Sequence, residues 1–176
     1  NGATVVDDPR ERWAGHEVWD CVASNAVKYG ATYVPLGYHP SMTRFAPAAE
    51  QDIAVLLYGC MNARRKDLVD AMAARGLRVM VASGVWGAER DALIARSKVV
   101  LNVPFNPEGE WGELRALHLV ANSIFVLCEA LPETWPFVAK TPYEDIVDRA
   151  VWWARAPAGT RAAVCRRALE ELKKMP

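Results

Sequence analysis

Five short apolar runs, separated by amphipathic stretches, constrain the fold of this chain more than any other feature. They span residues 31–37, 53–59, 77–83, 98–104 and 124–129. Each run holds six or seven residues, is rich in Val, Leu and Ile, and is nearly continuous. Such runs are typical of strands buried on both faces of a parallel sheet. Their shortness, and the Gly, Ser or Pro at which most of them end, favour strands over buried helices.

The stretches between the runs carry helical patterns. The clearest, residues 62–75, begins at Asn62, a good N-cap residue, and precedes Gly76, which suits the position after a helix. Further helices are predicted at residues 89–96, 113–121, 143–155 and 160–174. Strands that alternate with helices imply right-handed crossovers. We therefore predict an α/β fold, a Rossmann-like open parallel sheet of about five strands with helices on both faces.

The length of 176 residues is typical of one domain. We expect residues 1–30 to be the end of a preceding domain or a linker, together with a helix. Residues 31–156 should form the Rossmann-like domain, and residues 157–176 a C-terminal helix. Because the sequence begins at Asn1 rather than at Met, we also expect a processed or partial chain.

The charge balance and the cysteines narrow the class of protein. Lys plus Arg and Asp plus Glu number 21 each, so the chain has no general attraction for nucleic acid, and we expect no such partner. No apolar run approaches 18 residues, so no membrane span is expected. The widely spaced Cys21, Cys60, Cys128 and Cys165 form no metal-binding pair, which favours a reduced, cytoplasmic protein without zinc or disulfides.

The loop after the second run is the most informative candidate site. Open α/β sheets bind ligands beyond the carboxyl ends of their strands. Here Gly59 permits a sharp turn and a helix follows at Asn62, so free backbone N–H groups face the strand end and favour an anion. Arg64 and Arg65 lie in the first turn, where they oppose the helix dipole unless an anion is bound. The alternative is that both arginines are solvated or pair with acids on the same helix.

Other loops at the carboxyl edge contain candidate site residues whose roles are less well defined by the sequence. Trp86, flanked by glycines that include Gly87, can stack on a nucleobase or simply pack over the sheet edge. His39 is a candidate catalytic residue, or a loop residue that hydrogen-bonds locally. Glu110 and Glu129 are further catalytic candidates, although Glu110 can equally belong to the acidic first turn of a helix. The chain has no GxGxxG after its first run, no P-loop and no GxSxG motif, which disfavours standard dinucleotide folds, NTPases and hydrolases of those types.

Residues 52–104 resemble bacterial and phage proteins of the glycosyltransferase group 1 type. The shared pattern is a strand, a YG turn, an N-x-R-R helix start and a G-x-[YW]-G turn, then RD-x-LI-x-x-SK and another strand. Weaker resemblance extends from about residue 13 to about residue 156. Several motifs in the same order are far more specific than any one of them.

This resemblance implies the C-terminal, donor-binding half of a GT-B fold. Such a domain holds a nucleotide-diphosphate sugar as co-substrate and transfers the sugar to an acceptor, here unknown, without a metal or other cofactor. The resemblance implies that Gly59, Arg64 and Arg65 would meet the diphosphate and Trp86 the base. Arg115 and Glu129 would lie near the ribose or sugar, and Asn62 and Gly87 would belong to the same nucleotide-sugar site. A missing N-terminal domain or a partner chain would supply the rest of the enzyme.

The sequence also departs from that family. Many retaining members carry two glutamates seven residues apart after the fourth strand; Glu110 can stand for the first, but Leu117 occupies the second position. Residues 122–124 replace the usual Gly-x-Pro before the last strand. These departures leave the catalytic residue unassigned, with His39, Glu110 and Glu129 as candidates. They also keep open a rival interpretation, a non-catalytic α/β binding or regulatory module that kept the fold without the chemistry.

Overall fold

The computed structural model describes residues 13–107 and 111–175, which fall into two compact units, 13–37 and 38–175. The small unit contains strand β1 (Trp19–Asp20), helix α2 (Ala23–Tyr29) and strand β2 (Thr32–Tyr33). The two strands pair in parallel and form a sheet of their own. Gly30 ends the helix in the left-handed conformation, at a φ of 67°.

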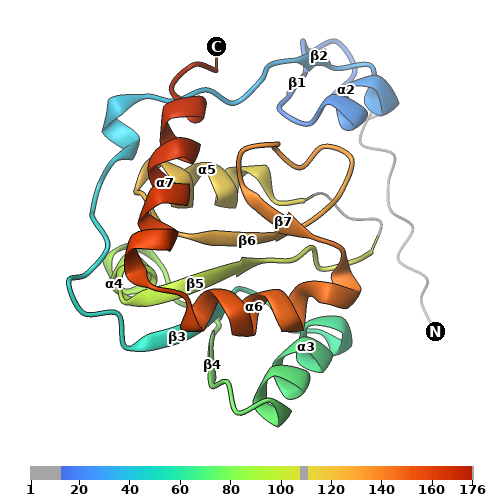
Figure 1. The fold of residues 1–176 in the computed structure, drawn as a ribbon. Coiled ribbons are helices and arrows are strands. Elements are labelled where there is room, and N and C mark those ends of the chain that lie inside the picture. The colour runs from blue at the N-terminus through green and yellow to red at the C-terminus, as the bar shows by residue number, and fades with distance from the viewer. Residues whose placement is uncertain (1–12, 108–110, 176) are drawn as a thin grey trace. The chain divides into compact units, whose positions relative to one another are not determined.

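The large unit is built on a five-stranded, all-parallel sheet in the order β4-β3-β5-β6-β7 (Figure 1). Its strands are β3 (Ile53–Tyr58), β4 (Val79–Ala82), β5 (Ser97–Asn102), β6 (Val126–Glu129) and β7 (Ala139–Thr141). Its helices are α3 (Ala63–Ala74), α4 (Gly87–Ala95), α5 (Glu113–Ala121), α6 (Ile146–Arg155) and α7 (Ala158–Leu172), with short 3-10 helices η1 (Pro40–Met42) and η2 (Tyr143–Asp145). The predicted Rossmann-like α/β class is confirmed.

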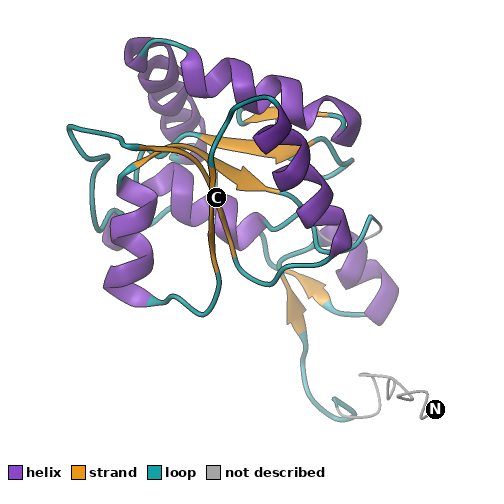
Figure 2. Cartoon of the chain, turned by 90° about the horizontal axis from the view of Figure 1, so that it is seen from below, coloured by secondary structure: helices purple, strands orange, loops and turns teal. Residues whose placement is uncertain are grey.

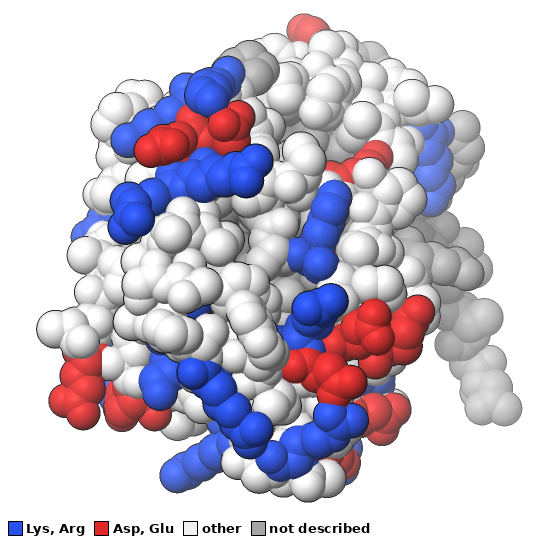
Figure 3. Space-filling view, in the orientation of Figure 1, with Lys and Arg blue, Asp and Glu red and all other residues white. Residues whose placement is uncertain are grey.

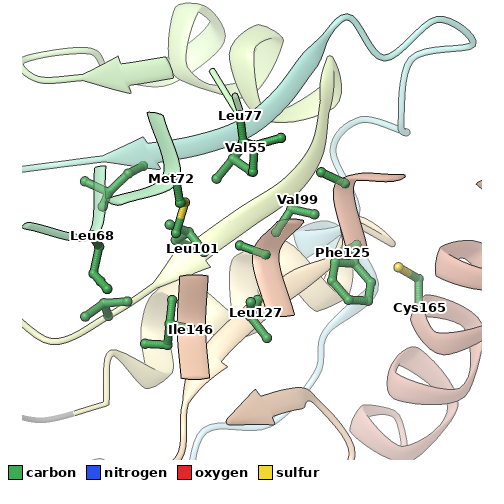
Figure 4. Close-up of a cluster of buried hydrophobic side chains, with 14 residues drawn as sticks. Val55, Leu68, Met72, Leu77, Val99, Leu101, Phe125, Leu127, Ile146 and Cys165 are labelled. Carbon is green, nitrogen blue, oxygen red and sulfur yellow. The ribbon is translucent and has the colours of Figure 1, made fainter. Parts of the chain in front are cut away.

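Helices cover both faces of this sheet, as the view along it shows (Figure 2). Helices α3 and α6 pack together on one face, α4 and α5 lie on the other, and α7 packs against α5. The buried cluster drawn in Figure 4 lies on the α3–α6 face, with side chains from β3, β5 and β6 meeting Met72 and Ile146. Burial of this apolar surface is the main force that holds the helices to the sheet.

The predicted strand at residues 31–37 is wrong as a member of this sheet. Only Thr32–Tyr33 is extended and paired, and its partner is β1. The fifth strand is instead β7, which has no strand signal in the sequence because Ala-Lys-Thr has no apolar run and buries only Thr141. The run at residues 53–59 corresponds to β3, an interior strand next to the central β5.

Candidate functional site

The carboxyl edge of the large sheet contains a point where the strand order reverses. From β3 the chain moves to β4 on one side, then returns past β3 to β5 and continues to β6 and β7. Ligands of open α/β sheets bind in the crevice at such a point, beyond the carboxyl ends of the two strands. Here the crevice lies between the loops that follow β3 and β5, and helices α3 and α5 begin beside these loops.

The Arg65 side chain occupies this crevice. Its Nη1 donates a hydrogen bond to the Cys60 carbonyl and its Nη2 to the Val103 carbonyl, both at 2.6 Å. The residue is only 6% exposed, and its Nε has no hydrogen-bond partner among the described residues. Burial, together with the nearby charge of Arg115, lowers the pKa of the Arg65 guanidinium. Arg65 therefore ties the loops after β3 and β5 together.

Arg115, on the first turn of α5, approaches the same place from the other side. A Cβ on Gly59 would lie 3.1 Å from Arg115 Nη2 and 3.8 Å from Arg65 Nη1, and the φ of Gly59 is 109°. The Arg115 guanidinium also lies over the Tyr58 ring, 4.5 Å from its centroid. Among the described residues, no carboxylate lies within 4.0 Å of Arg65 or Arg115. Two guanidinium groups thus converge over Gly59, and no carboxylate of the described residues pairs with either of them.

The first turn of α5 is held at this edge by Asn102, the last residue of β5. Asn102 Nδ2 donates to the Trp111 carbonyl at 2.7 Å and to the Gly112 carbonyl at 3.3 Å. Gly112, the N-cap residue, is in the left-handed conformation and has no side chain that could cap the helix. The start of α3 differs, because Asn62 Oδ1 accepts from the Arg65 backbone N–H at 3.0 Å. The predicted cap at Asn62 is confirmed, and α5 has the more open N-terminus.

A cleft of about 800 Å³ lies on the α3 side of the edge and is lined by Asn62, Arg64, Phe105, Glu129 and Tyr143, among others. Arg64 Nη2 pairs with Glu129 Oε1 at 2.5 Å, and the guanidinium lies 3.9 Å from the Tyr143 ring centroid. Glu129 is 6% exposed, and its Oε2 has no hydrogen-bond partner among the described residues. The cleft therefore contains a buried carboxylate oxygen that can accept another hydrogen bond.

Three more residues were predicted to belong to the site, and the structure describes two of them. Trp86 follows β4 at the carboxyl edge, directly before α4, and is 76% exposed. Gly87 is the first residue of α4 and has a φ of 54°. Glu110 lies outside the described residues, so its role as a candidate catalytic residue stays a prediction. The expected placement of Gly59, Trp86 and Glu129 at one edge of the sheet agrees with the strand topology.

His39, expected at the same edge, lies at the opposite one. It caps η1, and the segment that follows contacts the C-terminal end of α5, where Thr43 Oγ1 donates to the Ala121 carbonyl at 2.9 Å. Because α5 runs against the strand direction, this end lies near the amino edge of the sheet. The prediction was wrong because residues 31–37 are not a strand of the large sheet, so the residues after them do not follow a carboxyl end.

A charged cluster between α4 and α5 was not predicted. Asp91, 7% exposed, accepts from Arg90 Nη2 at 2.8 Å and lies 3.1 Å from His118 Nε2. Burial acts to raise the pKa of Asp91, but the bonds from Arg90 and His118 hold it below its ordinary value. Burial and the charge of Arg90 lower the pKa of His118. No sequence pattern signals this cluster, since residues 91 and 118 meet only through packing of the two helices.

Glu113, an acid in the first turn of α5, is half-buried beside an aromatic group. Its Oε1 accepts from Trp135 Nε1 at 3.1 Å. Burial, with a contribution from the charge of Glu133, raises the pKa of Glu113. The position of an acid two residues before Arg115 could have drawn attention to it.

Comparison of this chain with models of protein families and with curated proteins finds no match. Among the described residues, no helix combines the length and apolar character needed to cross a bilayer. No group of three or more His, Cys, Asp or Glu side chains in those ranges is arranged to hold a metal ion. Basic and acidic side chains are interspersed over the face shown in Figure 3 rather than gathered by sign.

Proposed function

We propose that this chain contains the donor-binding domain of a nucleotide-sugar glycosyltransferase. The observation that carries the proposal is the convergence of Arg115 and Arg65 over Gly59, with no described carboxylate beside either guanidinium. Such a concentration of positive charge favours an anion with several oxygens, and a guanidinium can bind two of them at once. The uncapped N-terminus of α5 adds a favourable dipole at the same edge.

In this proposal a diphosphate lies beside Gly59, where the absence of a side chain lets the Arg115 and Arg65 guanidiniums approach the turn together. Arg115 is its principal ligand, and Arg65 contributes charge while its N–H groups hold the two loops. The same groups would stabilise the negative charge that develops on the leaving diphosphate during sugar transfer. The Glu129 carboxylate lines the adjoining cleft, and its Oε2 has no partner among the described residues. It supports a nearby ribose or sugar, because hydroxyl groups donate to carboxylate oxygens. The resemblance of residues 52–104 to glycosyltransferases favours a nucleotide sugar over other diphosphates.

Calorimetric titration with UDP, GDP and ADP, each free and as the glucose conjugate, tests binding. We expect Arg115→Ala to weaken the preferred nucleotide by about 1.5–3 kcal/mol, the range for hydrogen bonds to charged groups, or roughly tenfold or more in Kd. Arg115→Lys should restore only part, because an ammonium cannot fork onto two oxygens. Arg78→Ala is the matched control, since Arg78 lines a pocket at the opposite edge of the sheet. The proposal fails if the unaltered protein binds none of these ligands at millimolar concentration.

Trp86→Ala separates base stacking from simple packing in the same titrations. If a nucleobase stacks on this exposed indole, the substitution should cost about 1–3 kcal/mol of binding. No change would assign the base elsewhere at the edge.

The rival, a binding module without transfer activity, has one observation in its favour. Leu117, at the position of the second family glutamate, is a buried apolar residue. The glycosyltransferase and the binding module differ in whether a bound nucleotide sugar is consumed. A donor domain in a working enzyme should release free nucleoside diphosphate from the bound nucleotide sugar once an acceptor is present, whereas the module should not.

A further inference from the structure

Cys60 is an exposed cysteine beside the two guanidinium groups that converge over Gly59. It is the second residue after β3, and its backbone carbonyl accepts from Arg65 Nη1 at 2.6 Å. This bond holds the loop at the crevice, so that Cys60 lies next to the Arg65 guanidinium. The proposed diphosphate contacts make no use of the Cys60 side chain.

The surroundings of Arg65 favour a negatively charged group at this place. Burial lowers the pKa of the Arg65 guanidinium and the charge of Arg115 lowers it further, whereas a negative charge on Cys60 acts in the opposite sense. Arg65 is 6% exposed, and its Nε has no hydrogen-bond partner among the described residues. A buried cation that the fold leaves partly unsatisfied points to an anionic ligand. Arg115 is only partly buried and can contact such a ligand directly.

The other three cysteines lie in less reactive surroundings. Cys128 and Cys165 are buried, and burial raises the pKa of each thiol to about 12, so both are protonated at neutral pH. Cys21 is partly exposed and belongs to the small unit. Reactive cysteines are those that are accessible and lie in positive surroundings, because the thiolate is the nucleophile. Of the four cysteines, Cys60 is the exposed one and has guanidinium groups beside it.

We propose that Cys60 is a modification site for small anionic disulfides, whose carboxylates bind the Arg115 and Arg65 guanidiniums while the thiol undergoes exchange. The Cys60 thiol loses its proton to water, and the thiolate attacks one sulfur of the disulfide. A new S–S bond forms as the old one breaks, and the other half leaves with the electron pair as a thiolate, which takes up a proton. The disulfide is itself the oxidant. Glutathione disulfide, which carries carboxylates on both halves, has the required chemistry.

An adduct on Cys60 would occupy the crevice and exclude a diphosphate from the position beside Gly59. Exchange with a second thiol would release the adduct and reopen the site. The inference therefore adds a reversible control to the proposed function. It does not depend on that function, because the exchange needs only the thiol and the two guanidiniums.

The test compares two aromatic disulfides of different charge at pH 7, in a Cys21→Ser background. Dithiobis-nitrobenzoate carries two carboxylates, whereas dithiodipyridine is neutral. Because both react with the same thiolate, the ratio of their rate constants cancels its nucleophilicity and reports the charge around it. We expect this anionic-to-neutral ratio to fall about threefold or more in Arg115→Ala and in Arg115→Gln, because one cation has been removed. Arg78→Ala, at the opposite edge of the sheet, is the matched control and should leave the ratio unchanged.

Salt and mass spectrometry supply independent measurements. Raising KCl to about 0.5 M should lower the ratio in the Cys21→Ser protein, since salt screens the attraction. After incubation with glutathione disulfide, peptide mass spectrometry should find the adduct on Cys60, and dithiothreitol should remove it. Cys60→Ser should abolish the fast reaction with both aromatic disulfides. Near-UV circular dichroism of the tryptophans verifies that each variant is folded.

Three results would overturn the inference. They are an adduct confined to other cysteines, a fast reaction that persists in Cys60→Ser, and a ratio that is the same in both Arg115 variants as in their parent. None of these measurements involves a nucleotide, so this inference and the proposed function can fail separately.

Discussion

Single residues at the carboxyl edge carry charge in two distinct ways. Arg65 satisfies its guanidinium with backbone carbonyls, so its charge is part of the framework of the site. Arg115 has an aromatic neighbour, Tyr58, and no described acidic partner, so its charge is open to a ligand. The sequence placed Arg64 and Arg65 in one helical turn. It could not show that Arg64 pairs with Glu129 while Arg65 turns into the crevice, because these directions depend on strands far away in the chain.

Glu113 gives a prediction about stability that is independent of any ligand. Its pKa in the folded protein is raised above the ordinary value of 4.5. The folded state therefore binds the proton more tightly, and this contribution to stability is present below about pH 4.5 and lost as the pH rises through the folded pKa. Glu113→Gln, which resembles the protonated form, should be more stable than the unaltered protein at pH 7, by a few tenths of a kcal/mol to about 1 kcal/mol, because water screens this half-exposed group.

Urea denaturation at pH 4, 5.5 and 7 measures this effect. The difference between the two proteins should be largest at pH 7 and close to zero at pH 4. A difference that is the same at all three values would mean that Gln acts through packing rather than through charge.

At the scale of elements, capping residues and apolar periodicity were sufficient to predict individual helices. Asn62 and Gly76 mark both ends of α3, and the apolar stripe of residues 113–121 coincides with α5. Which strands pair with one another was harder to predict from the sequence. The run at 31–37 has the composition of a buried strand, yet pairs outside the main sheet, and β7 pairs inside it with almost no apolar character. Strand order depends on which edges meet in space, and periodicity carries no information about that.

The junction between β5 and α5 is the element on which the site geometry depends most. Gly112 has a φ of 78°, and a Cβ there would lie 2.7 Å from Oδ1 of the buried Asn102. We predict that Gly112→Ala destabilises the protein by about 2–4 kcal/mol, because it adds left-handed strain, about 1–2 kcal/mol, to the loss of hydrogen bonds made by Asn102. Equilibrium unfolding in urea gives the value.

Gly76→Ala is the control for that substitution. Gly76 has a similar φ of 72°, but a Cβ there would meet nothing within 4 Å. It should therefore cost only the left-handed strain. Equal losses in the two variants would show that Asn102 accommodates the new methyl group, and that the position of α5 does not rest on this contact.

On the scale of the whole molecule, the apolar core belongs to one part of the chain. The main buried cluster, drawn in Figure 4, lies entirely within residues 38–175, as do all five strands of the large sheet. The small unit has two strands of two residues each and leaves Trp19 and Val27 mostly exposed. A two-stranded sheet of that size is marginally stable at best. The free energy of unfolding should therefore come mainly from residues 38–175.

This distribution predicts that a fragment spanning residues 38–176 folds by itself. We expect one cooperative urea transition, with a midpoint within about 0.5 M of that of the full chain, because a small-domain m-value of ~1–3 kcal/mol/M makes this difference about 0.5–1.5 kcal/mol. If the full chain binds a nucleoside diphosphate, the fragment should bind it with a Kd within about threefold, since Gly59, Arg65 and Arg115 are all retained. A fragment that fails to fold would show that the residues removed, 1–37, stabilise the large sheet. A folded fragment that no longer binds would instead place part of the nucleotide site in the residues removed.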